Sequence, residues 1–340
     1  MKNCSQWSLA TVVLLGVFYL TLSSCNGSRA QVNNNEFTYA TVQLNLDHEE
    51  LTYKNLRLYP IEAKENFLNQ AKSYGKYLSL DEALATEKLE ISEKSISVGR
   101  GDEVNTLFVE NTSKDTIFLL AGSVVKGGKQ DRTLANDVVL LPKSGKLDLD
   151  VFCVEQGRWD EKSENRVADK PMEEKKFKKT MAFAKPSVRK MAAVEKEQTK
   201  VWDKVSEANV KANNVTSTAA YTSFDNNVAY KQTEMEYEQF FKSKFPNNDR
   251  IIGVVAVSGN KVIGCDLFAT RQMFLSAWGK LLPSFINEAI NDGAMVNISK
   301  GAVKKYTNQL FANEPNQAKY LERNGKLFKH NNRVMHLVAY

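Results

Sequence analysis

In the first half of the chain, apolar and polar residues alternate over several short stretches, the pattern of half-buried β-strands. The clearest stretch is 147–153, whose odd-numbered residues form one apolar face that ends at Cys153. Residues 37–46 alternate in the same way, and 51–61 and 116–125 also have the composition of strands. We therefore predict that the chain is rich in β-strands up to Trp159.

After Trp159 the apolar residues recur at helical spacing. One long amphipathic helix is predicted to begin at a Ser187 cap, and its apolar face consists of Val188, Met191, Val194, Val201, Val205 and Ala208. Further helices are predicted over 224–245, from a Thr270 cap onward and over 301–311. Pro283 lies inside the pattern that follows Thr270, so a kink or a new helix start is expected there.

Strands also return late in the sequence. Residues 251–257 and 262–268 are apolar runs joined across Gly259-Asn260, which predicts a β-hairpin. Short strands are predicted around 319–323 and 334–340. Strands followed by helices favour an α+β fold with mostly antiparallel sheets, a β-rich N-terminal half and a helix-rich C-terminal half with a late hairpin.

Changes in composition divide the chain into five predicted parts. They are a lipoprotein signal peptide over 1–24, a lipidated Cys and tether over 25–35, a β-rich part carrying a glycine-basic loop over 36–159, a charged helical insertion over 160–214, and an α/β part with the hairpin over 215–340. The last part is expected to pack on the β-rich part, so that together they complete one domain.

The N-terminus has the features of a secretory signal. Lys2 is followed by an apolar run over 9–22, which ends in Ser23-Ser24-Cys25. Leu-Ser-Ser-Cys resembles the lipobox of bacterial lipoproteins, which implies that Cys25 is acylated, for example with palmitate, and anchors the protein in a lipid bilayer. The alternative is a secreted protein with an incidental Cys. Asn26 does not resemble an inner-membrane retention signal, so we expect an outer-membrane anchor that faces the periplasm.

Net charge and cysteine content exclude several classes of protein. The formal charge of +6 falls to +5 without Lys2, and basic and acidic residues are interspersed, so nucleic acid is not an expected partner. Cys153 and Cys265 either pair in an oxidising compartment or serve as small buried apolar residues, and their apolar surroundings favour the second reading. The three histidines, His48, His330 and His336, are scattered, so neither a metal site nor a cofactor is predicted.

The stretch 121–159 combines charged residues with glycines that allow the backbone to approach a ligand closely. The candidate ligand-binding residues are Lys126, Gly127, Gly128, Lys129, Gln130, Arg132, Arg158 and Trp159. Backbone amides, lysines and a guanidinium together match the geometry of a phosphate or carboxylate. The alternative is a tight turn at a sheet edge with solvated lysines.

Glu155 is the candidate catalytic residue, and two interpretations of its role are possible. It serves either as a general acid or base, or as the structural ion-pair partner of Arg132 or Arg158, and the structural reading is favoured. Cys153 lies on the apolar face of its strand with no histidine near it in sequence, so a nucleophilic role is disfavoured.

The blocks VKGGKQDR at 125–132 and FCVEQGRW at 152–159 resemble two signature blocks of the ARG and Rhodanese-Phosphatase-superfamily-associated Protein domain family. The hairpin at 254–268, LTYKNLRLYP at 51–60 and LDEAL at 80–84 are similar to further blocks. The family pattern has Gly-Ala-Lys-Gln-Asn-Arg at 127–132 and an acid at Ser123, so any acidic role at Ser123 is in doubt here. The family's name implies an association with ADP-ribosylglycohydrolases and rhodanese-like phosphatases, and hence with nucleotide-type ligands, but it implies no catalytic residue.

Two functions remain open. The first is a membrane-anchored, non-catalytic binding or assembly module for an anionic small molecule or an envelope protein. The second is a hydrolase acting on an ADP-ribose-like substrate or a phosphate ester, with Glu155 as general acid or base and Lys129 and Arg132 stabilising developing charge. The lack of a recognisable nucleophile, base or metal set favours the module.

Overall fold

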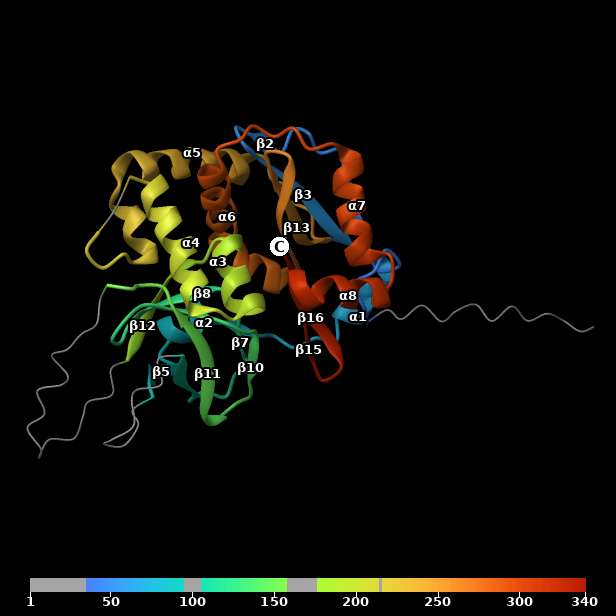
Figure 1. The fold of residues 1–340 in the computed structure, drawn as a ribbon. Helices are drawn as coiled ribbons and strands as arrows, with labels where there is room; N and C mark the ends of the chain where they lie inside the picture. Colours follow the sequence, from blue (N-terminus) through green and yellow to red (C-terminus); the bar gives the residue numbers. More distant parts are fainter. Residues whose placement is uncertain (1–34, 95–104, 158–175, 214–215) are drawn as a thin grey trace, which may run out of the picture. The chain divides into compact units, whose positions relative to one another are not determined.

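A seven-stranded antiparallel sheet lies at the centre of the fold (Figure 1). The structure is a computed structural model that describes residues 35–94, 105–157, 176–213 and 216–340. The strands follow the order β1-β3-β13-β14-β16-β15, and β2 pairs with β3 beside this path. Their bounds are β1 Val42–Leu44, β2 Thr52–Tyr53, β3 Leu56–Ala63, β13 Ile251–Ser258, β14 Lys261–Phe268, β15 Gly325–His330 and β16 Arg333–Ala339.

The predicted late hairpin is confirmed as β13 and β14. Ser258 pairs with Lys261 across the two-residue turn, in which Gly259 has a φ of +54°. All eight residues of β13 are buried. The near-continuous apolar sequence of β13 follows from this, because both of its faces are covered.

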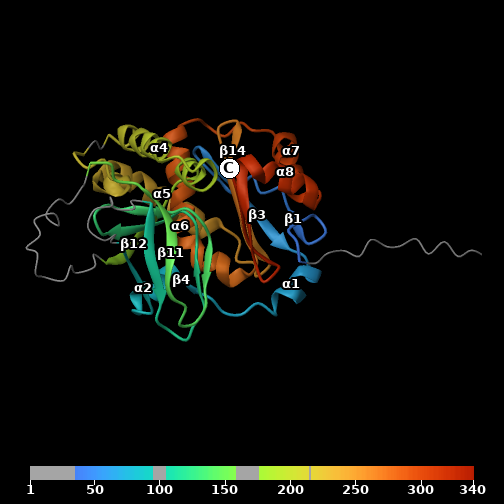
Figure 2. The same ribbon diagram turned by 60° about the horizontal axis from the view of Figure 1, so that its bottom comes forward.

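Helices cover the two faces of this sheet. Side chains of β13 alternate, so that Val254 and Ala256 pack in the core that contains α6, while Val255 and Val257 pack in the core that contains α7 and α8. Figures 1 and 2 show α6 on one side of the sheet and α7 on the other. The bounds are α5 Val228–Lys244 and α6 Arg271–Asp292 for the first face, and α1 Glu65–Ala71, α7 Lys300–Phe311 and α8 Glu314–Asn324 for the second.

A second region contains the remaining strands in two smaller sheets, of order β10-β7-β4 and β12-β8-β9-β11-β6-β5. All their pairs are antiparallel except β4 with β7. The bounds are β4 Leu78–Ser79, β5 Leu89–Glu93, β6 Thr106–Asn111, β7 Ile117–Leu119, β8 Ser123–Gly127, β9 Arg132–Leu134, β10 Val138–Leu140, β11 Gly145–Cys153 and β12 Phe177–Phe183. The predicted strand at 147–153 is present as part of β11, although Leu147 is 43 % exposed.

The architecture is therefore α+β, as the order of the predicted elements indicates. The described residues from 35 to 340 form one compact unit. The predicted signal peptide and Cys25 lie outside the described residues, as do Arg158 and Trp159.

The prediction of one long helix after Ser187 is wrong. The chain forms α3 (Pro186–Lys190), a π-helical turn (Met191–Glu195) and a separate helix α4 (Gln198–Lys211). Lys196 adopts the left-handed conformation, with a φ of +56°, and this ends the first helical segment. The apolar spacing survives the break, since Val188, Val201 and Val205 all reach the same core.

Two other predictions differ from the structure. The strand predicted at 319–323 is wrong, because these residues belong to α8, which starts at an Asn313 cap and buries Gln317 and Leu321 one turn apart. Of the two alternatives expected at Pro283, a kink or a new helix start, the new start is wrong, since α6 continues through this residue. Burial of Leu282, Phe285 and Ile286 on this part of α6 offsets the loss of one backbone hydrogen bond.

The short helix α2 (Leu80–Ala85) begins with a capping box formed by residues within its own first turn. Ser79 is its N-cap, and Glu82 completes a capping box by accepting a hydrogen bond from the Ser79 amide. This fixes the start of α2 beside β4, at the wall of the pocket described below.

Candidate functional site

The predicted glycine-basic loop connects β8 to β9 as the tip of a hairpin. Gly128 has a φ of +54°, and a Cβ atom there would lie 2.4 Å from the Glu93 Oε1 atom and from the Phe177 ring. The carboxylate of Glu93 also accepts the Lys129 amide at 2.8 Å. The positive φ of Gly128 and its closeness to these two side chains therefore indicate that the loop tip packs tightly against β5 and β12.

The polar residues after this glycine form a buried network, which we call the loop network: Gln130, Asp131, Arg132 and Glu155. The side chain of Gln130 donates to the Glu155 carbonyl at 2.8 Å and accepts from Arg132 Nη1 at 3.2 Å. The amide of Asp131 donates to Glu155 Oε2 at 3.1 Å. The structure thus brings the predicted glycine-basic loop into contact with Glu155, the candidate catalytic residue.

Burial determines what this network can do. Arg132 is 0 % exposed and Glu155 is 4 % exposed, so their polar atoms are directed at the protein itself. Cys153 beside them is buried, and burial raises the pKa of its thiol against the opposing charge of Arg132. Lys126 is exposed at the edge of the hairpin, and Lys129 is partly exposed.

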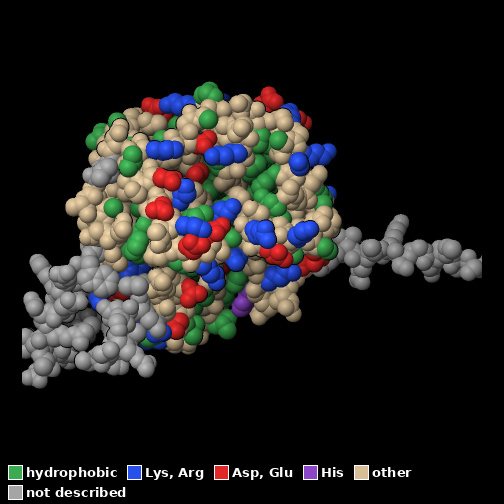
Figure 3. All heavy atoms as spheres, in the orientation of Figure 1, with side chains coloured by type: hydrophobic (Ala, Val, Ile, Leu, Met, Phe, Trp, Pro, Cys, Tyr) green, Lys and Arg blue, Asp and Glu red, His purple; other side chains and the backbone are tan. Residues whose placement is uncertain are grey.

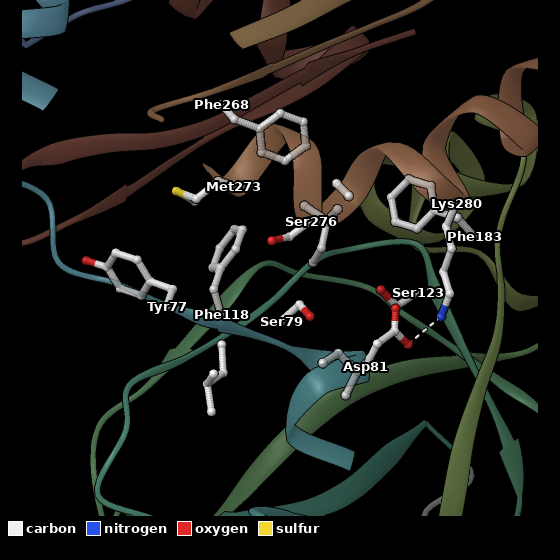
Figure 4. A pocket seen from close by; sticks show the side chains of 14 residues that line it. Tyr77, Ser79, Asp81, Phe118, Ser123, Phe183, Phe268, Met273, Ser276 and Lys280 are labelled. Carbon is white, nitrogen blue, oxygen red and sulfur yellow. Dashed lines mark hydrogen bonds and ion pairs between the residues drawn. The ribbon is translucent and has the colours of Figure 1, made fainter. Parts of the chain in front are cut away.

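A different place in the structure contains a preformed pocket, which we call the apolar pocket. It has a volume of about 50 Å³ and lies between α6 on one side and β4, α2, β7 and β8 on the other (Figure 4). Apolar side chains dominate its wall, with three serines and a tyrosine among them. The lining residues are Tyr77, Leu78, Ser79, Leu80, Asp81, Phe118, Leu120, Ser123, Phe183, Phe268, Met273, Ser276, Ala277 and Lys280.

An ion pair stands at one end of the apolar pocket. Lys280 on α6 donates to the Asp81 carboxylate on α2, and Figure 4 shows the two side chains facing each other at the end away from Tyr77 and Met273. The Lys280 ammonium is also 3.5 Å from the Thr180 carbonyl of β12. This pair links the two elements that bound the pocket.

Behind the aromatic wall of the apolar pocket lies a buried charge cluster, which consists of Asp137, Arg189, Asp266 and His336. The guanidinium of Arg189 forms a bidentate pair with Asp266, with Nη1 3.0 Å from Oδ2. His336 lies 2.7 Å from Asp137 through Nδ1 and 3.1 Å from Asp266 through Nε2. Two cations and two anions therefore balance each other in the interior.

The charge cluster and the apolar pocket share two aromatic residues. Phe183 lines the pocket and lies 4.3 Å from the Arg189 guanidinium carbon, and Phe268 lines the pocket and stacks on His336 at 4.5 Å. Gly122 lies beneath the Arg189 stem, where a Cβ atom would be 2.8 Å from Arg189 Cγ. The cluster thus supports the pocket wall without being exposed in it.

The environment of the charge cluster shifts the ionisation of its members. Burial opposes a charge on His336, but Asp137 and Asp266 outweigh burial and raise the pKa of His336 to about 9. Burial alone would raise the pKa of Asp266, but Arg189 and His336 hold it below its ordinary value. At neutral pH the imidazole is therefore protonated and both of its nitrogens donate.

The sequence analysis misses this cluster, because it takes His336 as one of three scattered histidines. The signal was the position of Asp266 and His336 inside strands whose other residues are apolar, because a buried charge needs a partner. Their partners come from positions 137 and 189, which no local pattern joins to them. Strongly perturbed groups beside a pocket mark a candidate site.

Neither described cysteine takes part in a disulfide bond. Cys153 and Cys265 are both buried and free, and burial raises the pKa of the Cys265 thiol well above its ordinary value.

Among residues 35–94, 105–157, 176–213 and 216–340, no three His, Cys, Asp or Glu side chains are grouped in a way that would hold a metal ion. In the same ranges, no helix has the length and apolar character needed to cross a membrane.

Comparison with known proteins gives one match. The model of the ARG and Rhodanese-Phosphatase-superfamily-associated Protein domain matches residues 46–336, which include the loop network, the apolar pocket and the charge cluster. No curated protein and no solved structure matches the chain. Because the match covers most of the sequence, the chain belongs to the ARG and Rhodanese-Phosphatase-superfamily-associated Protein domain family.

Proposed function

We propose that the protein is a membrane-anchored lipoprotein that acts as a non-catalytic binding or assembly module. The lipobox-like sequence ending at Cys25 supports the anchor, and Asn26 supports an outer-membrane location facing the periplasm. The binding site is the apolar pocket, which receives an apolar group from a small ligand or from a protein partner.

The observation that carries this proposal is the separation of the candidate catalytic groups from the pocket. A hydrolase that uses Glu155, Lys129 and Arg132 needs these side chains to converge on a cavity. Instead, Glu155 accepts a backbone amide within the loop network, and none of the three residues lines the apolar pocket. The loop network therefore has a structural role in this proposal.

The lining of the apolar pocket indicates what it would take. Aromatic and aliphatic side chains make most of the wall, and the Asp81–Lys280 pair with Ser79, Ser123 and Ser276 supplies polar groups. A compact apolar group with a polar end, such as a short acyl chain end or an apolar side chain of a partner, meets both features. The polar groups would orient this group and the apolar wall would supply most of the binding free energy.

A substitution that fills the apolar pocket tests the proposal. Ala277→Phe places a ring in the pocket from α6, whereas Leu275→Phe adds a ring on the 51 % exposed face of the same helix and serves as the control. Small amphiphiles that raise the melting temperature of the wild-type chain should lose this effect in Ala277→Phe and keep it in Leu275→Phe. Equal shifts in both variants would remove the pocket as the binding site.

The anchor has its own test. Cells that express the wild-type chain are expected to incorporate labelled palmitate into it, and Cys25→Ala should abolish the label and release the protein from the membrane fraction. Cys4→Ala is the matched control, because Cys4 lies within the predicted signal peptide. Retention of the label in Cys25→Ala would contradict the lipoprotein assignment.

A further inference from the structure

A groove separates α7 from α8 on the face of the large sheet opposite to α6, and we call it the basic groove. It has a volume of about 660 Å³ and shares no lining residue with the apolar pocket. In Figure 3, Lys and Arg side chains lie over this part of the molecule, at the right of the view. The lining residues are Gly301, Lys304, Lys305, Asn308, Gln309, Ala312, Asn316, Lys319, Tyr320, Arg323 and Asn324.

Helical spacing directs the polar side chains of both helices into this groove. On α7, Lys304 and Asn308 lie four residues apart, and the C-cap residue Ala312 follows four residues later. On α8, Asn316, Lys319 and Arg323 recur at intervals of three and four. Two helices thus present matching stripes, and the small residues Gly301 and Ala312 keep the space between them open.

The charge in the groove has one sign. Its lining includes four basic residues, four side-chain amides and no carboxylate. The nearest acids of α8, Glu314 and Glu322, line a different groove on the other side of that helix. Asp47 and Glu49 are paired with Lys300, which precedes the lining residues of α7.

The four cations are consequently available to a ligand. Lys304, Lys305, Lys319 and Arg323 form no ion pair with any residue in the described parts of the chain. Other surface lysines differ from these four. Lys54 pairs with Glu236 and Lys88 pairs with Asp115, and each of these lysines has a carboxylate within 3 Å. Four unpaired like charges in one groove repel each other, and a bound anion would relieve this repulsion.

We propose that the basic groove binds a phosphate group, carried either by a soluble phosphate ester or by the headgroup of an anionic phospholipid. Phosphate fits the donor set. An arginine donates hydrogen bonds to two phosphate oxygens, lysines neutralise the phosphate charge, and side-chain amides donate to the remaining oxygen atoms. The groove offers all three kinds of donor within about two helical turns.

The test compares matched variants of the full chain. Lys319→Ala/Arg323→Ala removes two cations from the groove, and Lys114→Ala/Lys244→Ala removes two exposed lysines that lie outside it. Calorimetric titration with inorganic pyrophosphate at low salt should give binding that the groove variant weakens about tenfold or more and the control variant weakens less than twofold. Added salt should weaken the wild-type binding.

The second arm separates the two sources of phosphate. Sedimentation with vesicles of phosphatidylglycerol is compared with vesicles of phosphatidylcholine, for the same three proteins. If the groove variant loses binding to phosphatidylglycerol vesicles and the control variant keeps it, a lipid headgroup is a ligand, whether or not the wild type also binds pyrophosphate. If the wild type binds pyrophosphate but not phosphatidylglycerol vesicles, the ligand is a soluble ester. The proposal is overturned if neither probe binds, if the control variant loses as much as the groove variant, or if a poly-glutamate peptide competes as well as pyrophosphate at equal charge.

Discussion

The buried charge cluster and the basic groove both contain several charged side chains, but the cations are paired with carboxylates in the cluster and unpaired in the groove. In the cluster, each of Arg189 and His336 has a carboxylate within about 3 Å, and the four side chains are at most 4 % exposed. In the groove, four cations stand at the surface without a carboxylate among the lining residues. Charged side chains therefore belong to the fold where they are neutralised internally, and they are available for a ligand where they are not.

The largest expected effect comes from breaking the cluster at its arginine. Arg189→Met leaves Asp266 buried with only His336 as counter-charge, and we expect a loss of about 3–5 kcal/mol in the free energy of unfolding, measured by urea denaturation. Arg250→Met, at the exposed pair with Glu65, should lose under about 1 kcal/mol. A small effect of Arg189→Met would contradict the structural role of the cluster.

A pH titration of stability gives the next largest effect. The pKa of His336 is about 9 in the folded protein against about 6.5 in the unfolded chain, so its contribution is complete below pH 6.5 and is lost as the pH rises toward 9. Since each unit of pKa corresponds to about 1.4 kcal/mol, a loss of a few kcal/mol is expected. His336→Gln should flatten this part of the curve, whereas His330→Gln should leave it as in the wild type.

The same titration has an acid side with the opposite sign. The pKa of Asp266 is lowered in the folded protein, so its contribution is present above the unfolded value near 4 and is lost as the pH falls through the lower folded value. The difference in unfolding free energy between wild type and Asp266→Asn should therefore shrink below pH 4. A difference that stays constant down to pH 2 would exclude Asp266 as an ionised member of the cluster.

An intermediate effect is expected in the loop network. Gln130→Ala removes one donor to the Glu155 carbonyl and the acceptor of Arg132 Nη1, which should cost about 1–3 kcal/mol in the free energy of unfolding. Gln239→Ala, which removes the same type of side chain from an exposed position on α5, is the control. If Gln130→Ala leaves stability unchanged and alters ligand binding instead, the loop has the binding role that its sequence first suggested.

The smallest effect on stability is expected in the basic groove. Removing Lys319 and Arg323 should leave the urea midpoint unchanged or slightly raised. The substitutions reduce the repulsion among like charges in the groove and break no ion pair. A marked destabilisation would show that these cations serve the fold after all, and the contrast with the charge cluster would fail.

Local signals allowed much of the fold to be predicted. The Gly259-Asn260 turn between two apolar runs and the Ser79–Glu82 capping box both encode their geometry within a few residues. The break at Lys196 has no such signal, since lysine ordinarily continues a helix, whereas here it adopts the left-handed conformation. Residues 319–323 were assigned to the wrong element because short mixed stretches suit both periods.

The candidate site was less predictable for a related reason. The glycines and charges at 126–132 look like a ligand loop in sequence, but a Cβ at Gly128 would clash with Glu93 and Phe177, which are distant in the chain. The charge cluster joins positions 137, 189, 266 and 336, and the apolar pocket joins β4 to α6. Such contacts depend on tertiary pairing, which periodicity along one segment does not encode.

The position of β13 in the sheet also determines the order in which the molecule can be assembled. Ile61 of β3 lies opposite Gly253 of β13, so the early strand has no neighbour on that side until residues far along the chain have been synthesised. Closing so long a loop is entropically unfavourable, and proteins dominated by distant pairings fold slowly. The pairing of β3 with β13 is therefore expected to limit the rate of folding, and the nascent chain carries an apolar strand that needs protection from aggregation until its partner arrives.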